Sequence, residues 1–369
     1  MTDVVLRDPL LKRAMRWGWS AVLGGHALLS AATSGGNAIR VFYGGARPGD
    51  VGGPLVKVKR LRAAFPESWW RYTVVYTLSN TPYLPDIALR LLQRRGVPIV
   101  HNQNGVFYPA WFLGDWQGRN ARMARTYHRA DYVFYQSAFC RKSADRFLGK
   151  RSGPGEILYN AVDTHAFSPQ ADLSERPQRF RFLITGKIDD HLFYRLESTV
   201  QGIDAARRRG LDCCLEIAGW VAPSPLARAR ALAAQLGLSD MVVFSGPYTQ
   251  ESAPAIYRRA DAYVMTKHND PCPNTVLEAL ACGLPVLYSD SGGVGELVGP
   301  CGVALPCEES WDTPKVPDSQ AIGAGMLAIA ADHANLAPAA RARAIDRFDI
   351  EHWLQRHHDV FVHLIGDHP

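Results

Sequence analysis

Strand-like and helix-like segments alternate along nearly the whole chain, with one break near the middle. The strand-like segments are short and rich in β-branched and aromatic residues, which is typical of strands buried in a parallel sheet. The segments between them are typical of helices, and this alternation predicts parallel sheets covered by helices on both faces. Strands are expected at 39–45, 72–79, 97–103, 131–137, 156–160, 181–187, 214–220, 241–247, 262–268, 285–290 and 302–306.

The alternation breaks at the polar segment 168–179, SPQADLSERPQR. A chain of 369 residues is longer than one hydrophobic core usually supports, so two domains joined by this linker are expected. The predicted fold is α/β, with two doubly wound Rossmann-like domains facing a central cleft. The expected parts are an N-terminal extension (1–37), a first domain (38–170), a second domain (171–345) and a C-terminal amphipathic helix (346–369).

Composition excludes several classes of protein. A hydrophobic content of 47% and a charged content of 21% are ordinary for a globular protein. The formal charge of +6 favours an anionic small molecule or a phosphate-bearing surface, and no motif that reads DNA or RNA is present, so no nucleic-acid partner is expected. The seven cysteines lack the spacing of metal ligands, and reduced thiols in a cytoplasmic protein are the preferred interpretation.

The N-terminal extension leaves three interpretations open. Residues 17–36 follow a basic segment and contain no Asp, Glu, Lys or Arg, but glycines and polar residues make them a poor membrane span. They fit an ordinary N-terminal helix or tail, a membrane-surface helix with Trp17 and Trp19 at the interface, or an export signal. Export agrees least with the rest of the chain, which is typical of an intracellular nucleotide-binding protein.

The segment 268–296 concentrates polar groups at one strand end. Asp270 lies in the loop after the strand 262–268, and Glu278 lies about one turn inside the following helix. A helix N-terminus presents unpaired amides, which suit a diphosphate. Prolines donate no hydrogen bond, so the available donors are expected to be the amides of Asn274, Thr275 and Val276.

Carboxylates beside such amides indicate a ligand with both phosphate and hydroxyl groups. Glu278 would repel a phosphate but accepts hydrogen bonds from the vicinal diol of a ribose, which points to a sugar nucleotide. Taken singly, Asp270 could cap a helix and Glu278 could be a surface residue. Their combination with a second strand, Gly292-Gly293 and Glu296 favours the binding site.

Four segments in this order resemble the retaining family 4 glycosyltransferases (glycosyl transferases group 1), which have the two-domain GT-B fold. They are LYNAVDTHAFSP, LITGKIDD, MVVFSGPYTQESAPAIYRRADAYVMTKH and DPCPNTVLEALACGLPVLYSDSGGVGELV. The resemblance covers roughly residues 38–365 and is most specific in the C-terminal half. It implies that the C-terminal helix crosses back to the first domain.

The resemblance assigns roles to residues of the second domain. Asp270 matches the acid near the transferred sugar, where glutamate is usual, and Glu278 matches the ribose-binding glutamate. Lys187 stands where the family has an arginine that neutralises the donor diphosphate, and Arg195 is either the second such cation or a solvated surface arginine. Further candidates within the matched segments are Gly186, Asn160 and Glu296.

The first domain offers a less specific site. Gly52-Gly53 matches a glycine pair that approaches the donor phosphates and the acceptor in the family, although glycines after a strand are often only turn residues. Asn104 stands where the family usually has a histidine beside the reacting sugar. His101 is a secondary catalytic candidate, and a structural histidine is the alternative.

Two clusters of basic residues can be interpreted in two ways. Each is either a solvated helix face or a surface that docks on anionic lipid. They are Arg119, Arg122, Arg125 and Arg129 on one helix, and Lys57, Lys59, Arg60 and Arg62 on another. Lipid docking would place the protein at the cytoplasmic membrane face and would suit a lipid-linked acceptor.

The resemblance implies transfer of a sugar from a nucleotide-diphospho-sugar to a hydroxyl of a glycan or lipid-linked acceptor, with retention at the anomeric carbon. The sequence has no Asp-x-Asp motif, so neither a divalent metal nor a cofactor other than the donor substrate is expected. The alternatives are a sugar-nucleotide-binding protein without transferase activity and a nucleotide-sugar epimerase of related fold.

Overall fold

This computed structural model describes residues 10–30, 38–50, 52–170 and 179–366. The chain divides into two compact units. Unit 1 comprises Met1–Tyr159, Trp311–Thr313 and Glu351–Pro369, and unit 2 comprises Asn160–Ser310 and Pro314–Ile350. Most of the polar linker expected at 168–179 lies outside the described residues, as do both ends of the N-terminal extension.

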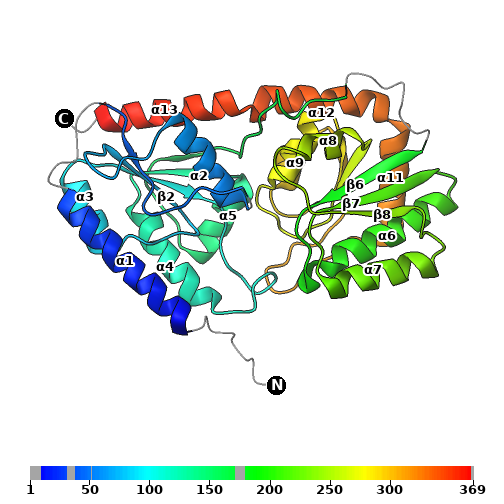
Figure 1. The fold of residues 1–369 in the computed structure, drawn as a ribbon, viewed down its shortest axis with the longest axis horizontal. Coiled ribbons are helices and arrows are strands. Elements are labelled where there is room, and N and C mark those ends of the chain that lie inside the picture. The colour runs from blue at the N-terminus through cyan, green and yellow to red at the C-terminus, as the bar shows by residue number, and fades with distance from the viewer. Residues whose placement is uncertain (1–9, 31–37, 51, 171–178, 367–369) are drawn as a thin grey trace. The chain divides into compact units, whose positions relative to one another are not determined.

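Unit 1 contains a five-stranded parallel sheet whose strands lie side by side in chain order (Figure 1). The strands are β1 (Val41–Phe42), β2 (Val74–Leu78), β3 (Ile99–Gln103), β4 (Tyr132–Tyr135) and β5 (Gly155–Ile157). The helices are α1 (Leu10–Ser30), α2 (Gly53–Ala64), α3 (Asp86–Arg94), α4 (Trp116–Arg129), α5 (Ala138–Phe147) and α13 (Ile350–Gly366), of which Ile350 belongs to unit 2.

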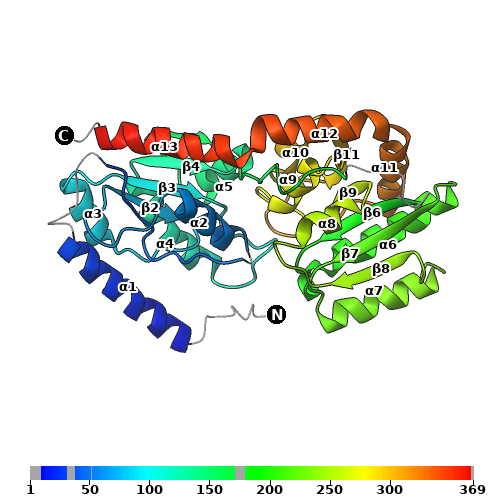
Figure 2. The same cartoon turned by 45° about the horizontal axis from the view of Figure 1, so that its top comes forward.

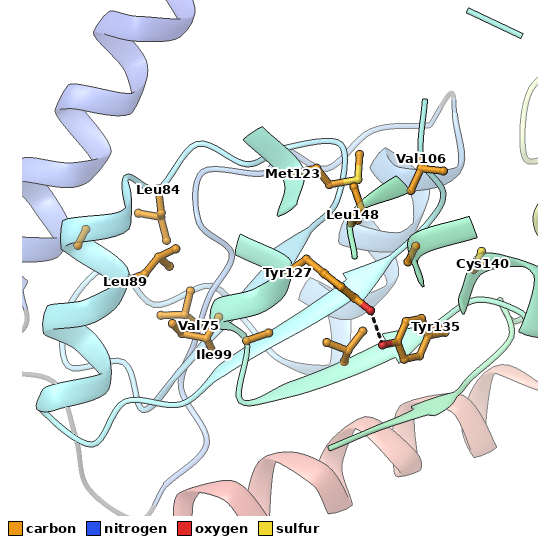
Figure 3. Packing of buried hydrophobic residues seen from close by; sticks show 14 of the residues in the cluster. Val75, Leu84, Leu89, Ile99, Val106, Met123, Tyr127, Tyr135, Cys140 and Leu148 are labelled. Atoms are coloured by element: carbon orange, nitrogen blue, oxygen red, sulfur yellow. Dashed lines mark hydrogen bonds between the residues drawn. The ribbon is translucent and has the colours of Figure 1, made fainter. Parts of the chain in front are cut away.

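One face of this sheet packs against α3, α4 and α5 (Figure 3). Val75 of β2 and Ile99 of β3 point into this core, and Tyr127 of α4 meets Tyr135 of β4 with their hydroxyls 2.9 Å apart. Side chains alternate between the two faces along a strand, so the neighbouring Tyr76 points to the opposite face.

The opposite face of the sheet is covered by α2 and α13. The hydroxyl of Tyr76 lies 3.1 Å from Nε2 of His357, and Phe361 packs edge-on against Phe65 and Tyr76. The C-terminal helix therefore belongs to unit 1, as the resemblance implied, and the stripe predicted along it is buried.

Unit 2 contains a six-stranded parallel sheet in the order β11-β10-β9-β6-β7-β8 (Figure 2). The order reverses between β6 and β9, which is the doubly wound pattern. The strands are β6 (Phe180–Thr185), β7 (Cys213–Ala218), β8 (Val242–Gly246), β9 (Ala262–Met265), β10 (Val286–Ser289) and β11 (Gly302–Leu305).

The helices of unit 2 cover both faces of its sheet (Figures 1 and 2). They are η1 (Asp190–Leu192), α6 (Phe193–Arg208), α7 (Pro223–Gln235), α8 (Ala253–Arg258), α9 (Asn274–Ala281), α10 (Val294–Val298), α11 (Ser319–Ala331) and α12 (His333–Phe348). Each expected strand is present. The sequence analysis did not predict α11 and α12, whose segments are rich in alanine and poor in large apolar residues, and α12 contains Pro338.

The unit boundaries differ from the expected 170/171 and 345/346 by several residues. Residues 160–169 fold into unit 2, because Val162 pairs with Asp349 and Arg258 donates to the Ser168 carbonyl at 2.9 Å. Trp311 instead belongs to unit 1, where it stacks on Phe139 and meets Tyr108 edge-on.

Candidate active site

Most of the predicted donor-site residues lie on segments that follow β6 and β9, where the strand order of the unit 2 sheet reverses. The loop after β6 carries Gly186 and Lys187, and the segment after β9 leads through Asp270 into α9. Because β6 and β9 are adjacent parallel strands, these two segments leave the same edge of the sheet. In doubly wound sheets this is the position at which ligands bind.

Arg195 is buried on the first turn of α6 and lacks a normal hydrogen-bonding environment. Its Nε has no hydrogen-bond partner in the described part of the chain, and Nη2 lies 3.8 Å from the Met265 sulfur. Arg195 is therefore not a solvated surface arginine. A buried guanidinium is costly unless an anion pairs with it, so this position fits an anionic ligand.

Two further buried polar atoms near Arg195 in the fold are also without partners among the described residues. They are Oγ1 of Thr266, directly after β9, and Oδ1 of Asn274, the first residue of α9. Buried polar groups are nearly always hydrogen-bonded. Such exceptions occur in both units, among them Asn102 Nδ2 of unit 1, and these three lie on the segments that leave or adjoin one edge of the unit 2 sheet. Thr266 was not among the predicted site residues, since a threonine at a strand end carries no distinctive sequence signal.

The N-terminus of α9 supplies fewer amides than expected. Its N-cap is Pro273, and no side chain caps it. The Val276 amide already donates to the Pro273 carbonyl at 3.1 Å, so the prediction of three available amides is wrong for Val276. The sequence could not show this tight first turn, which leaves Asn274 and Thr275 as the candidate donors.

Glu278 is buried on α9, so it is not a surface residue. Its Oε2 accepts a hydrogen bond from the Tyr257 hydroxyl at 2.8 Å. Burial, and then the Glu278 charge, raises the pKa of Tyr257 well above its ordinary value, so Tyr257 stays a donor. Tyr257 thus holds one carboxylate oxygen in place, a role that the sequence did not reveal.

Asp270 is held in a rigid loop. Its side chain pairs with Lys267 at 2.8 Å and accepts from the Cys272 amide at 3.3 Å, while its carbonyl accepts from the Gly293 amide at 2.9 Å. Gly292 has a φ of +71°, and a Cβ there would lie 2.5 Å from the Asp270 carbonyl oxygen. The glycine pair therefore lets the loop containing Asp270 pack tightly against the start of α10.

The other predicted residues of unit 2 take different positions. Lys187 is exposed, with Nζ 4.9 Å from the ring centre of Trp220. The Asn160 side chain donates to the Cys272 carbonyl at 2.9 Å and so fixes the loop after Asp270. Gly186 has a φ of +122°, and Glu296 lies on α10 with its carbonyl accepting from Arg343.

A connected polar network lies at the carboxyl end of β3, although Asn102 Nδ2 has no hydrogen-bond partner among the described residues. Lys57 is buried and donates to Oδ1 of Asn102 at 2.7 Å, and Gln136 donates to the same oxygen at 3.0 Å. Gln136 also donates to Oδ1 of Asn104, which is half-buried. Gly52 has a φ of +92° and caps α2 ahead of Gly53.

His101 is a structural residue and does not fit a catalytic role. It is fully buried, and its ring nitrogens lie 2.9 Å from the Thr77 hydroxyl and 3.1 Å from Oε1 of Gln103. Burial lowers the pKa of His101 to about 4. The β3 register points this residue into the sheet core, which the position of a lone histidine in a sequence cannot show.

The structure also shows the contacts of the two basic clusters that the sequence analysis singled out. Lys57 is buried and Arg62 pairs with Glu67, so the cluster on α2 is not one solvated or lipid-facing surface. On α4, Arg129 pairs with Asp86 at 2.6 Å, and Arg119 lies over the Phe112 ring. The described residues contain no group of His, Cys, Asp and Glu side chains arranged to bind a metal ion.

Comparison with protein families gives two matches. The model described as "Glycosyltransferase Family 4" matches residues 28–166, and that described as "Glycosyl transferases group 1" matches residues 199–312. The first model lies within the N-terminal half of the chain and the second within the C-terminal half.

Curated relatives have related names. The chain is 27% identical over 327 residues to the D-inositol 3-phosphate glycosyltransferase of Streptosporangium roseum, covering 80% of this chain and 73% of that protein. It is 30% identical over 188 residues to the GDP-mannose-dependent alpha-(1-6)-phosphatidylinositol monomannoside mannosyltransferase of Mycolicibacterium smegmatis, covering 46% and 47%. Other matches are short. The D-inositol 3-phosphate glycosyltransferase of Streptomyces bingchenggensis is 38% identical over 81 residues, which span 21% of this chain and 18% of that relative.

Solved structures show the same fold. Anabaena Alr3699/HepE in complex with UDP-glucose superposes with a TM-score of 0.62 at 19% identity, covering 84% of this chain and 82% of that one. Sucrose-phosphate synthase from Thermosynechococcus elongatus gives a TM-score of 0.62 at 20% identity, covering 85% and 78%. The two parallel-sheet α/β units and these structures show the GT-B fold, and the two family models together identify the chain as a family 4 glycosyltransferase.

Proposed function

We propose that this protein is a retaining glycosyltransferase that moves a sugar from a nucleotide-diphospho-sugar to an acceptor hydroxyl. The observation that carries the proposal is the buried guanidinium of Arg195, which has no carboxylate partner among the described residues, at the sheet edge that also presents Thr266 and the first turn of α9. An anionic ligand stabilises such a group most strongly, and a diphosphate supplies that charge.

In this proposal, unit 2 binds the donor. Arg195, assisted by Lys187 and the amides of Asn274 and Thr275, stabilises the charge that develops on the diphosphate as the sugar leaves. Glu278, held by Tyr257, accepts hydrogen bonds from the ribose hydroxyls. Asp270, paired with Lys267, is assigned to the transferred sugar.

The acceptor and the remaining conditions are also proposed. Two relatives are named for transfer to an inositol phosphate and to a phosphatidylinositol mannoside, which supports a polyol or lipid-linked acceptor for this chain. Asn104 is assigned to this reaction as a hydrogen-bonding residue of unit 1. The proposal also includes action at the cytoplasmic membrane face. The acceptor hydroxyl would attack the anomeric carbon from the front face, and the reaction would need no divalent metal. Support for the last comes from the absence of an Asp-x-Asp motif in the sequence.

A thermal-shift screen of the full chain against UDP-, GDP- and ADP-sugars, with magnesium or with EDTA, tests this function. The expected result is stabilisation by one donor class in both conditions, followed by product formation when a membrane extract supplies acceptors. Stabilisation without product would favour a non-catalytic binding protein. Conversion of the donor with no acceptor present would favour an epimerase, and no stabilisation by any donor would reject the proposal.

A further inference from the structure

The helix α1 is attached to unit 1 along one side only. Leu23 and Ala27 are fully buried in the core beside α3, and Ser20 donates to the Tyr83 carbonyl. Near the end of the helix, the Ser30 hydroxyl lies 2.7 Å from that of Tyr72. Figures 1 and 2 show α1 along the outside of unit 1, next to α3. These contacts fix the helix on the unit and define an outward face.

The outward face of α1 is apolar over the length of the helix. Its large apolar side chains are between 42% and 80% exposed, and they are Leu10, Leu11, Met15, Trp17, Val22, Leu28 and Leu29. Single exposed apolar residues are ordinary on a protein surface, but a continuous row along one helix indicates an interaction site. We call this row the α1 outer face.

Two exposed tryptophans extend the α1 outer face onto the body of unit 1. The rings of Trp69 and Trp70 pack edge-on against the His26 ring, 5.1 and 4.9 Å away between centres, and both indoles remain partly exposed. Tryptophan is the residue that favours the boundary between water and acyl chains, because its body is apolar and its N–H is polar.

Charge complementarity decides which partner fits this surface. Between Leu10 and Ser30 the chain has Lys12, Arg13 and Arg16 but no Asp or Glu. Basic residues beside an apolar helix face are attracted to anionic lipid headgroups while the apolar side chains enter the interface. None of the helices in the described part of the chain has both the length and the apolar content of a membrane span, so α1 would lie on a bilayer rather than cross it.

The family 4 match begins at residue 28, so nearly all of α1 precedes the matched region. The α1 outer face belongs to unit 1, whereas the donor site is proposed on unit 2.

We propose that the α1 outer face, with Trp69 and Trp70, is a docking surface for an anionic lipid bilayer. The apolar row inserts into the interface, and the positive charge of the segment 10–30 attracts the anionic headgroups. This proposal rests on the proposed function in naming the surface by which the protein would act at the membrane face. Because this binding requires neither a donor nor the catalytic residues, it can be tested apart from donor binding and sugar transfer.

Co-sedimentation of the full chain with vesicles tests this proposal. Vesicles of mixed phosphatidylglycerol and phosphatidylcholine are compared with vesicles of phosphatidylcholine alone, without donor. The expected result is binding to the anionic vesicles that is weakened at least about tenfold on the neutral ones. Equal binding to both compositions, or no binding to either, overturns the proposal.

Two variants locate the binding surface. The triple variant Trp17→Ser, Val22→Ser, Leu29→Ser removes exposed side chains only, and it is expected to lower the vesicle affinity at least about tenfold. The charge variant Lys12→Glu, Arg13→Glu is expected to lower it by a similar factor on anionic vesicles. The matched control, Val243→Ser, Ile345→Ser, Val362→Ser, removes exposed apolar residues elsewhere and should bind as the wild type does.

Three outcomes contradict the assignment. Wild-type vesicle binding by the triple variant places the lipid contact elsewhere. Self-association of the wild type, lost in the triple variant and seen by light scattering without vesicle binding, assigns the face to a second copy of the chain. Equal losses in the control variant show a general effect of surface polarity. Donor-induced thermal shifts, measured on the same samples, report separately on the donor site.

Discussion

The carboxyl edges of the two sheets are both rich in polar side chains, but the hydrogen-bond partners of these side chains differ. In unit 1, Lys57, Asn102, Gln136 and Asn104 bond to one another in a connected network. In unit 2, Arg195 is buried, and its Nε has no hydrogen-bond partner among the described residues. Asn102 Nδ2 of unit 1 also has none there, but it is a neutral amide within a network of protein hydrogen bonds, whereas Arg195 is a cation whose guanidinium lies 3.8 Å from a methionine sulfur.

This difference distinguishes polar side chains that stabilise the fold from polar side chains that are available to bind a ligand. A connected network such as that of unit 1 favours a single conformation of the sheet edge. A buried cation without an anionic partner lowers the stability of the unliganded protein and raises the affinity for an anion, because the cost of its desolvation has been met before binding. The position of Arg195 therefore supports the proposed binding of a charged ligand by unit 2.

Replacement of Arg195 should give the largest effect. Arg195→Met is expected to weaken binding of the nucleotide-sugar donor about hundredfold while leaving the unliganded protein at least as stable, since a buried unpaired charge is removed. Isothermal titration calorimetry measures the affinity and urea unfolding measures the stability. Arg208→Met, on the exposed side of the same helix, is the control and should change neither. A destabilised Arg195→Met with normal donor affinity would make Arg195 a structural residue.

Glu278→Ala is expected to raise the donor KM by about tenfold to hundredfold, because the ribose loses a charged hydrogen-bond acceptor. Initial rates at varied donor concentration measure this, and the exposed Glu251→Ala serves as control. An unchanged donor KM in Glu278→Ala would remove the ribose role from α9.

Acidification should act on unit 1 through its buried histidines. Burial lowers the pKa of His101 to about 4 and that of His357 to about 3, below the ordinary 6.5. Well above pH 6.5 neither histidine is protonated in the folded or the unfolded chain, so their titration does not change the stability there. As the pH falls below 6.5, the unfolded chain binds protons first, and each histidine destabilises the fold by about 2 kcal/mol near pH 5.

Urea unfolding of the variant His357→Gln checks this pH effect. Between neutral pH and about pH 5 it should lose about 2 kcal/mol less stability than the wild type does. His358→Gln alters an exposed histidine on the same helix and should lose as much as the wild type. Equal losses in all three proteins would mean that His357 is protonated in the folded state.

The smallest effect on catalysis is expected from replacing Asn104 in the polar network of unit 1. Asn104→Ala should lower kcat about fivefold through the lost hydrogen bond, with the donor Kd unchanged. Steady-state rates and calorimetry together separate the two quantities. Asn80→Ala removes only the 3.4 Å contact with Asn104 and is the control. A loss of donor affinity in Asn104→Ala would show that the unit 1 network takes part in donor binding.

The strands, and the loop and helix positions of Asp270 and Glu278, could be predicted from the sequence because they depend on local patterns. Alternating apolar segments define the strands, and the spacing from Asp270 to Glu278 places one acid in a loop and the other on a helix. Unit membership depended on long-range contacts, such as that of Val162 with Asp349, which no local pattern encodes.

Whether a buried polar side chain finds a hydrogen-bond partner could not be predicted from the sequence either, because this also depends on long-range contacts. Arg195 and Lys57 are both basic residues on early turns of helices, yet one lies against a methionine sulfur and the other against an amide oxygen. His101 differs from a catalytic histidine only by the strand register that turns it into the core. Partner atoms, rather than residue types, distinguish these cases.

The claim that Arg195 binds a diphosphate is tested most directly by calorimetry with two ligands on two proteins. The full chain and Arg195→Met are each titrated with the nucleoside diphosphate that binds best and with the corresponding nucleoside. The account predicts a loss of about hundredfold for the diphosphate and almost none for the nucleoside. Equal losses for both ligands, or wild-type affinity for the diphosphate, would contradict it.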